Sequence, residues 1–300
     1  MRYAHVAVRT ALNRLRKPDP WYGCEYTLNP YGGCEFSCPY CYSLASRWGA
    51  RYRARASLDA FSRGSQPGGG EAKIFIKGNL ISLLRREIRS KPKGVVFLGS
   101  ATDPYQPCED RFHLTRRCLQ LLKESGWPLE VGTKSDLVLR DLDVLSEISS
   151  EGFCYIFITI TTLDRELARL FEPRAPGPDR RLEVVEALSE QGIPVCVCMI
   201  PVFPGLTDEE ELIAEVAEAA RDHGADRFLA GALTLPGEVR ERFLKLIEAR
   251  FPDLLPLYQQ LYDRKGYPRR DYEDRLMAVV EEVRRRLGLL GELGRGPRYS

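Results

Sequence analysis

The sequence predicts an α/β protein with a parallel sheet that is either open or curled into a barrel. Its 300 residues are 44% hydrophobic, which is enough to bury one sizeable core. Short apolar runs of about four to eight residues, typical of strands covered on both faces, alternate with longer amphipathic segments. This alternation repeats about five or six times, as in folds that join parallel strands by right-handed helical crossovers.

The predicted strands and helices follow one another in regular order. The strands span Lys73–Lys77, Gly94–Gly99, Leu129–Thr133, Cys154–Thr161, Pro194–Ile200 and, as a further candidate, Arg227–Ala232. The helices between them span Leu80–Arg89, Arg111–Glu124, Leu137–Ser149, Arg180–Gln191 and Asp208–Asp222. In LLRREIRS and RLEVVEALSEQG, apolar residues recur at spacings of three and four, which predicts one buried face on each helix.

The segments on either side of this core have a different pattern. Residues 1–23 are polar and basic and are interrupted by Pro18 and Pro20, so we expect an N-terminal arm. Residues 24–235 contain the strand–helix core. From Pro236 onwards the strands stop, and we expect residues 236–300 to form a C-terminal helical cap rather than an independent domain. Its predicted helices are Glu238–Arg250, Asp253–Tyr262 and Tyr272–Leu287.

Charge and hydropathy exclude several classes of protein. The 44 basic and 42 acidic residues give a net charge of only +2, which excludes a histone-like polycation. No apolar run approaches the roughly 18 residues that span a bilayer, and the first residues lack the apolar centre of a secretion signal. We therefore expect a cytoplasmic protein with no membrane partner. The nine cysteines are an odd count, which favours ligand or redox chemistry over a disulfide framework.

Three of the cysteines lie close together in the segment GGCEFSCPYCY. Cys34, Cys38 and Cys41 form a C-x3-C-x2-C array, and such soft thiolate ligands select zinc or an iron–sulfur cluster. Structural zinc usually takes four protein ligands in two pairs, and neither His5 nor Cys24 stands at a paired spacing. Three ligands on a cluster of four irons leave one iron open for a substrate or cofactor. The alternative is a loop of partly buried free cysteines, which this spacing disfavours.

The array, with an aromatic residue between its second and third cysteines, resembles the signature of the radical S-adenosylmethionine (SAM) enzymes. The resemblance implies a 4Fe-4S cluster whose open iron binds the amino and carboxylate groups of SAM. In that family an electron cleaves SAM reductively to methionine and a 5′-deoxyadenosyl radical, which abstracts a hydrogen atom from the substrate. The implied partners are SAM and an electron donor such as flavodoxin or ferredoxin.

Longer strings resemble one branch of this superfamily, which contains spore photoproduct lyase and its uncharacterised "DNA repair photolyase"-like relatives. The strings are NPYGGCEFSCPYCY, GSATDPYQP, VGTKSDLVLRD, FEPRAPGPDRRLEVVEAL and MIPVFPGLTD, in this order across about residues 21–222. The resemblance implies a partial (β/α)6 TIM-type barrel of parallel strands with a C-terminal helical extension. Barrels of this type carry their active sites in the loops that follow the strands.

Polar residues at the predicted strand ends are the candidates for binding SAM. Ser100, Thr102 and Asp103 end one strand, and the family pattern implies that Thr102 bonds the SAM carboxylate. Lys134 ends the next strand as a fixed cation suited to a carboxylate, the alternative being a lysine that merely extends its charge to solvent. Thr159 ends the following strand and matches a serine of the family.

Further candidates flank the third cysteine or follow a later strand. Matching tyrosines of the lyase approach the cluster and SAM, which implies the same for Tyr40 and Tyr42, and Tyr42 is also a catalytic candidate. Glu172, Arg174 and Arg181 are candidates for holding the ribose or carboxylate of SAM. The alternatives are simple packing for the tyrosines and a solvated ion-pair cluster at a helix start for the charged residues.

The sequence departs from spore photoproduct lyase at one position that bears on the reaction. The lyase carries a cysteine where Ser100 stands, and that thiol gives a hydrogen atom to the product radical. A serine O–H bond is far stronger than a thiol S–H bond, so Ser100 cannot readily substitute. Either Cys108, in the loop DPYQPCED, takes over as the hydrogen donor, or the reaction is not thymine-dimer reversal. We favour the second reading.

The leading hypothesis is a radical SAM enzyme that abstracts a hydrogen atom from an unidentified substrate. Nucleic acid is one candidate for that substrate, and the alternatives are a peptide or a small metabolite. Two basic stretches with interleaved aromatic residues, residues 47–55 and residues 264–270, suit single-stranded nucleic acid; the alternative is a solvated helix face. A hypothesis of another class is a binding or sensing protein whose three cysteines hold zinc or a cluster without turnover.

Overall fold

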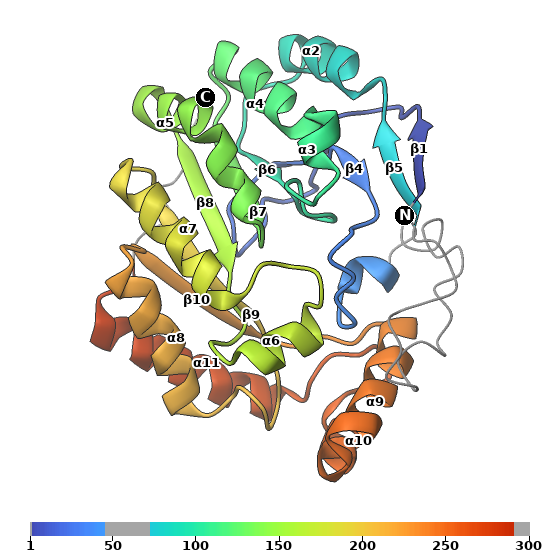
Figure 1. The fold of residues 1–300 in the computed structure, drawn as a ribbon, viewed down its shortest axis with the longest axis vertical. Coiled ribbons are helices and arrows are strands. Elements are labelled where there is room, and N and C mark those ends of the chain that lie inside the picture. The colour runs from blue at the N-terminus through green and yellow to red at the C-terminus, as the bar shows by residue number, and fades with distance from the viewer. Residues whose placement is uncertain (1, 46–72, 291–300) are drawn as a thin grey trace.

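The computed structural model describes residues 2–45 and 73–290, and its larger sheet has seven strands (Figure 1). The strand order is β10-β9-β8-β7-β6-β3-β2. All neighbours are parallel except β2, which pairs antiparallel with β3. The bounds are β2 Asn13–Arg14, β3 Tyr26–Leu28, β6 Val96–Leu98, β7 Leu129–Thr133, β8 Cys154–Thr159, β9 Val195–Val202 and β10 Arg227–Ala232. Six parallel strands therefore form the sheet of the predicted partial barrel.

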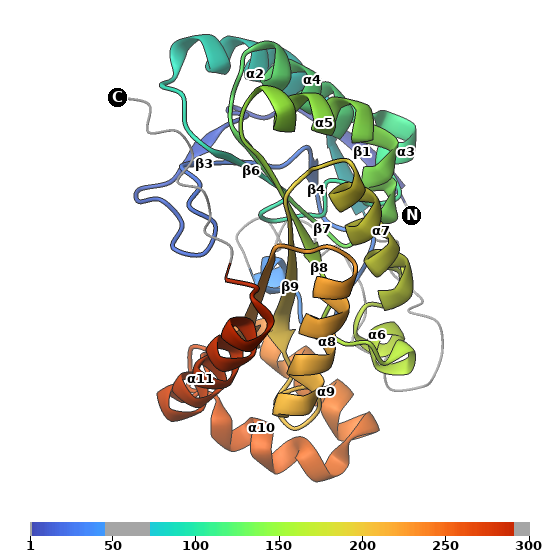
Figure 2. The same ribbon diagram turned by 90° about the vertical axis from the view of Figure 1, so that its left-hand side faces the viewer.

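Helices cover one face of this sheet, as Figures 1 and 2 show. The helices that follow β6, β7, β8 and β9 include α4 Leu114–Glu124, α5 Leu142–Glu151, α7 Pro178–Glu190 and α8 Glu210–Asp222. In the C-terminal extension, α11 Arg270–Leu287 packs against α8 and β10 and so covers the last barrel strand. The remaining helices are α2 Leu80–Ser90, α3 Glu109–Phe112, α6 Arg165–Phe171, α9 Glu238–Arg250 and α10 Leu255–Leu261, and the 3-10 turns are Tyr42–Ala45, Asp136–Asp141 and Pro252–Leu254.

Alternate residues of each strand belong to two different cores, because successive side chains of a strand point to opposite faces. On β6 and β8, Val96 and Ile156 pack in the large core beneath the helices. Their neighbours Phe97 and Phe157 pack in a second, smaller core inside the barrel, which also contains Cys198 of β9. The inner core forms the floor beneath the carboxyl ends of the strands.

The structure corrects the predicted position of one strand. Lys73–Lys77 is a strand, β5, but it lies in a separate three-stranded sheet between β1, Arg2–Val6, and β4, Tyr31–Gly32. Ile74 and Ile76 of β5 are buried in a third hydrophobic cluster, which is separate from both barrel cores. Because the apolar side chains of β5 are covered there, this strand pairs outside the barrel. The first barrel strand is instead β3, which is only three residues long and which the sequence pattern did not reveal.

The segment Leu15–Cys24 lies against the inside of the barrel. Its ends are held by backbone hydrogen bonds from Leu15 N to Glu25 O and from Asp19 N to Cys24 O, of 2.8 and 3.0 Å. Tyr22 packs on the inner core, with ring centroids 4.5 Å from Phe97 and 4.9 Å from Phe157. This part of the predicted N-terminal arm therefore contributes a wall to the barrel.

No helix among residues 2–45 and 73–290 has the length and apolarity that a membrane span requires.

Candidate functional site

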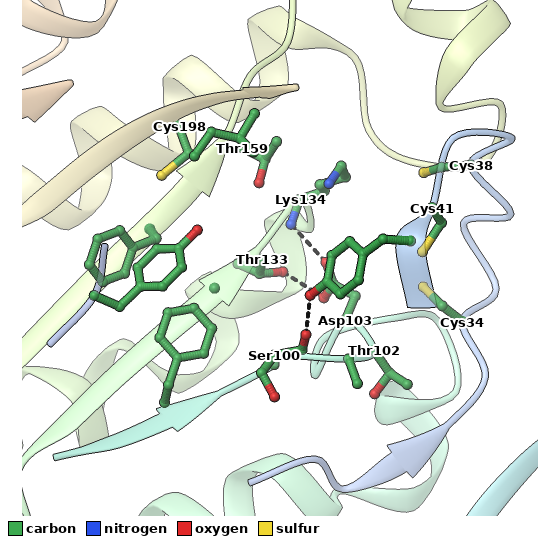
Figure 3. A pocket seen from close by; sticks show the side chains of 18 of the residues that line it. Cys34, Cys38, Cys41, Ser100, Thr102, Asp103, Thr133, Lys134, Thr159 and Cys198 are labelled. Atoms are coloured by element: carbon green, nitrogen blue, oxygen red, sulfur yellow. Dashed lines mark hydrogen bonds between the residues drawn. The ribbon is translucent and has the colours of Figure 1, made fainter. Parts of the chain in front are cut away.

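A cavity of about 450 Å³ opens at the carboxyl ends of the barrel strands (Figure 3). Cys34, Cys38 and Cys41 lie along one side of it, and Cys198 of β9 lies on the opposite side. The strand ends between them contribute polar side chains: Ser100, Thr102, Asp103, Thr133, Lys134 and Thr159. The structure therefore brings the predicted cysteine loop and the predicted strand-end residues into one site.

The cysteine loop is held in place by the segment that follows β6. Gln106, which is fully buried, donates to Gly33 O at 3.0 Å and accepts from Glu35 N at 3.0 Å. The carboxylate of Glu35 in turn accepts from Cys108 N at 2.5 Å. The string DPYQPCE thus braces the backbone of the loop on which the three cysteines stand.

The three thiols form a donor set suited to a multi-iron cluster. Burial raises the pKa of Cys34 to about 12, and the nearby carboxylate of Asp103 adds to this effect. Burial also raises the pKa of Cys38 well above its usual value. Their thiolates therefore require a bound cation for charge compensation. Among the described residues, no three His, Cys, Asp or Glu side chains converge closely enough to hold one metal ion.

Asp103 ties the ends of β6 and β7 together. Its carboxylate accepts hydrogen bonds from Thr133 Oγ1 at 2.7 Å, Lys134 N at 2.8 Å and Tyr105 N at 2.9 Å. Burial raises its pKa, and these hydrogen bonds oppose that rise. Because both carboxylate oxygens accept these hydrogen bonds, Asp103 positions the backbone of Lys134 at the end of β7.

Lys134 is oriented by a buried ionic network behind the cavity wall. Its ammonium lies 3.8 Å from Glu172 Oε1, and Arg181 contacts the other oxygen of this carboxylate at 2.5 Å. The hydroxyl of Tyr40 also donates to Glu172. Burial would raise the pKa of Glu172, but Arg181 and Lys134 lower it below the usual value, so the carboxylate is charged. Burial works against the charged form of Lys134, yet Glu172 and Cys38 raise its pKa on balance.

Glu172 and Arg181 do not themselves line the cavity. Their side chains are 1% and 2% exposed, and Arg181 also donates to Thr159 O at 2.9 Å and Pro176 O at 2.8 Å. The two side chains therefore contact Lys134, Tyr40 and the end of β8 behind the cavity wall.

The polar side of the cavity has an edge next to the cysteine loop, formed by Ser100, Thr102 and Tyr42. Asn29 donates to Ser100 Oγ at 2.9 Å, and its amide oxygen accepts from Ala101 N at 2.8 Å and Thr102 N at 3.3 Å. The exposed Tyr42 donates its hydroxyl to Ser100 O. The turn after β6 is therefore fixed by side chains from the start and the end of the cysteine loop.

Besides Glu172 and Arg181, two further predicted site residues, Cys108 and Arg174, lie outside the cavity. Cys108 is 1% exposed and packs with Tyr31, Ile74 and Leu114 in the cluster of the small sheet. The structure therefore places Cys108 in a core separate from the cavity, just before the start of α3. Arg174 is exposed and is not among the residues that line the cavity.

The structure reveals four further residues of the site that the sequence analysis did not select. Asn29 and Gln106 hold the loops in place by hydrogen bonds. An asparagine or a glutamine in a sequence does not by itself indicate a functional site. Tyr22 was assigned to an arm, and no pattern indicated that it packs inside the barrel. Cys198 stands in the apolar run of β9, a pattern typical of a packing residue. Its place on the inward face of β9, two residues before Ile200, is the signal that could have found it. The basic stretch 47–55 lies outside the described residues.

The fold and the cysteine loop define a class of protein. The chain belongs to the radical SAM superfamily, whose family model matches residues 28–217. The family implies a 4Fe-4S cluster and SAM as cofactors, and the protein is a radical SAM enzyme.

The chain is also similar to particular proteins. It is 29% identical to an uncharacterised protein of Mycobacterium bovis over 294 residues, which cover 97% of this chain and 82% of that protein. It is 31% identical to an uncharacterised protein of Methanocaldococcus jannaschii over 193 residues, or 64% of this chain and 66% of the other.

Among solved structures, the fold is similar to that of spore photoproduct lyase. A complex with dinucleoside spore photoproduct has a TM-score of 0.67 at 15% identity, covering 95% of this chain and 79% of the lyase. At this identity the likeness establishes the fold and leaves the reaction open.

Proposed function

We propose that this enzyme holds a 4Fe-4S cluster on Cys34, Cys38 and Cys41 and binds SAM against the ends of β6, β7 and β8. The observation that carries the proposal is that the three thiols and the polar strand ends share one cavity. With both cofactors bound, the site would supply a 5′-deoxyadenosyl radical that abstracts a hydrogen atom from a substrate.

The residues of the polar side have distinct roles in this proposal. Lys134 offers a fixed positive charge to the carboxylate of SAM, because Glu172 and Asp103 restrict its side chain and its backbone. Thr102, which is 7% exposed, offers a hydroxyl on the neighbouring strand end. Thr159 adds a further polar group on β8, and its carbonyl is held by Arg181.

The tyrosines beside the third cysteine limit the access of water. Tyr40 is 7% exposed and its ring lies 6.0 Å from the Lys134 ammonium. Tyr42 spans from the cysteine loop to Ser100 across the rim. A drier surrounding strengthens the electrostatic contacts of Lys134 and affects the potential of a bound cluster. We propose a cytoplasmic flavodoxin or ferredoxin as the electron donor.

The test is anaerobic reconstitution with iron and sulfide, followed by addition of dithionite and SAM. We expect an oxygen-sensitive brown protein and release of 5′-deoxyadenosine. Protein that shows no cluster absorbance and cleaves no SAM would overturn the proposal. Metal analysis of protein purified without air decides the alternative of a sensing protein, for which one zinc and no iron is the expected result.

We further propose that the substrate is a nucleic acid. The similarity of fold to a lyase seen with a dinucleoside photoproduct supports this class. Binding of single-stranded oligonucleotides that weakens steeply with salt is the expected outcome, because phosphate contacts release counterions. Absence of binding near 50 mM salt would instead favour a peptide or a small metabolite.

A further inference from the structure

The cavity has a second half that the proposed SAM-binding residues do not use. We define this arm-side half by Asp19, Tyr22, Phe97, Phe157 and Cys198, all of which line the cavity. Figure 3 shows Cys198 across the cavity from the three cysteines, with Lys134 between them. A group bound there would lie beside SAM and away from the cysteine loop.

Aromatic rings form the walls of the arm-side half. Tyr22 lies 4.5 Å from Phe97 and 4.9 Å from Phe157 between ring centroids, and the two phenylalanines are 5.8 Å apart. Phe97 lies flush against β7 because Gly132 has no side chain; a Cβ there would stand 2.8 Å from the Phe97 ring. Aromatic walls favour a planar ring, which can contact them face-on or edge-on.

The charges around the cavity favour a basic or neutral ligand over an acidic one in this half. Besides the cysteines, the charged side chains among the described lining residues are Asp19, Asp103 and Lys134. Lys134 faces Glu172, and both oxygens of Asp103 already accept hydrogen bonds. Asp19 uses only Oδ1, which accepts from Trp21 N at 2.8 Å and Tyr22 N at 3.1 Å. Its Oδ2 receives no hydrogen bond within the described part of the chain.

Asp19 and Cys198 are both neighbours of Tyr22. The backbone N–H of Tyr22 donates to Asp19 Oδ1 at 3.1 Å, and its ring packs against the inner core that contains Cys198. Burial raises the pKa of the Tyr22 phenol. Because Asp19 and Tyr22 belong to the segment Leu15–Cys24, the N-terminal arm supplies both the acidic group and one aromatic wall.

We propose that the arm-side half is the substrate subsite, that it takes a planar ring carrying an amino or N–H group and no acidic group, and that Asp19 and Tyr22 determine this specificity. The inference rests on the proposed function and deepens it. The ring chemistry is shared by an amine-bearing nucleobase, whose phosphate stays outside the cavity, and by an aromatic amine of a peptide or metabolite.

The test uses Cys198, which is 3% exposed, as a reporter inside the subsite. Anaerobic holoenzyme with SAM is treated with iodoacetamide, and alkylation of Cys198 is followed by peptide mass spectrometry. Benzylamine, benzyl alcohol and benzoate are added in turn at equal concentration. We expect benzylamine to slow alkylation most, benzyl alcohol less, and benzoate not at all. Protection of Cys198 by cytidine is then compared with protection by benzylamine. The compound that protects at the lower concentration shows whether the subsite prefers a nucleobase or an aromatic amine.

The decisive variant is Asp19→Asn, because the amide oxygen can still accept from Trp21 N and Tyr22 N and so preserves the turn. We expect its affinity for benzylamine to fall at least tenfold while that for benzyl alcohol is unchanged. Asp110→Asn, at an exposed position on α3, is the matched control and should behave as the parent.

Two results would overturn the proposal: benzoate protecting as well as benzylamine, or Asp19→Asn leaving the order of the three probes unchanged. Tyr22→Ala gives a second measurement, since removal of the wall should raise Cys198 alkylation at least tenfold without any probe. Because the parent releases 5′-deoxyadenosine whether or not the subsite is assigned correctly, failure here is distinguishable from failure of the proposed function.

Discussion

Replacement of Glu172 by Gln tests whether the buried ionic network behind Lys134 holds the site together. The substitution keeps the shape of the side chain and removes its negative charge. Arg181, which is 2% exposed, and Lys134, which is 19% exposed, then share a buried space without a counter-charge. Breaking a buried ion pair by removing one partner costs about 3–5 kcal/mol. Arg181 keeps two carbonyl acceptors, which places the expected loss near the lower end, about 3 kcal/mol.

The assay is thermal and urea unfolding of the parent and variant proteins without cofactors. For a chain of this size about 3 kcal/mol corresponds to a fall in melting temperature of about 6 °C. The exposed pair of Arg180 and Glu183 provides a control, because its side chains are 49% and 58% exposed and Glu183→Gln should cost less than about 1 kcal/mol. A loss at Glu172 no larger than the loss at Glu183 would refute the reasoning.

The pH dependence gives the same test a second readout. The pKa of Glu172 is lowered in the folded protein, so its carboxylate binds fewer protons there than in the unfolded chain at acidic pH. Its contribution is fully present above the ordinary value of 4.5 and is lost as the pH falls through the lowered folded value. The stability difference between parent and Glu172→Gln should therefore be constant near neutral pH and shrink below about pH 4.5.

Three further predictions concern the cluster and the barrel interior. Cys34→Ala should abolish cluster absorbance and release of 5′-deoxyadenosine after reconstitution. Cys108→Ala should retain both, because Cys108 lies in a separate core. Retention of SAM cleavage by Cys34→Ala would contradict the proposal that Cys34 is a cluster ligand. Gly132→Ala should lower the free energy of unfolding by about 1–3 kcal/mol, because its Cβ would stand 2.8 Å from the Phe97 ring. The measurement is unfolding in urea, and an unchanged urea midpoint would disprove the close contact between Gly132 and Phe97. Burial raises the pKa of Glu130 to about 9, so parent stability should decline as the pH rises from 4.5 towards 9. Glu130→Gln should remove that decline and be the more stable protein at pH 8, and an equally steep decline in the variant would exclude Glu130 as its source.

The strands and the polar residues at their ends were predictable because both depend on local sequence. Runs such as Cys154–Thr159 are mostly apolar, and a residue that follows a strand, such as Lys134 after Leu129–Thr133, emerges at the carboxyl edge of a parallel sheet. The same argument failed for Lys73–Lys77, whose alternating pattern also fits the small separate sheet. A strand pattern predicts that a segment pairs, and it does not say with which sheet.

The sequence by itself determined that Cys34, Cys38 and Cys41 share one loop, because so few residues separate them. Only the tertiary structure decided which other groups join them. Cys108 follows a strand end yet turns into another core, and Cys198 looked like packing yet faces the cavity. Tyr22 and Asp19 enter the barrel from a segment whose composition indicated an external arm. These placements depend on contacts between residues far apart in the chain, and local spacing carries no information about such contacts.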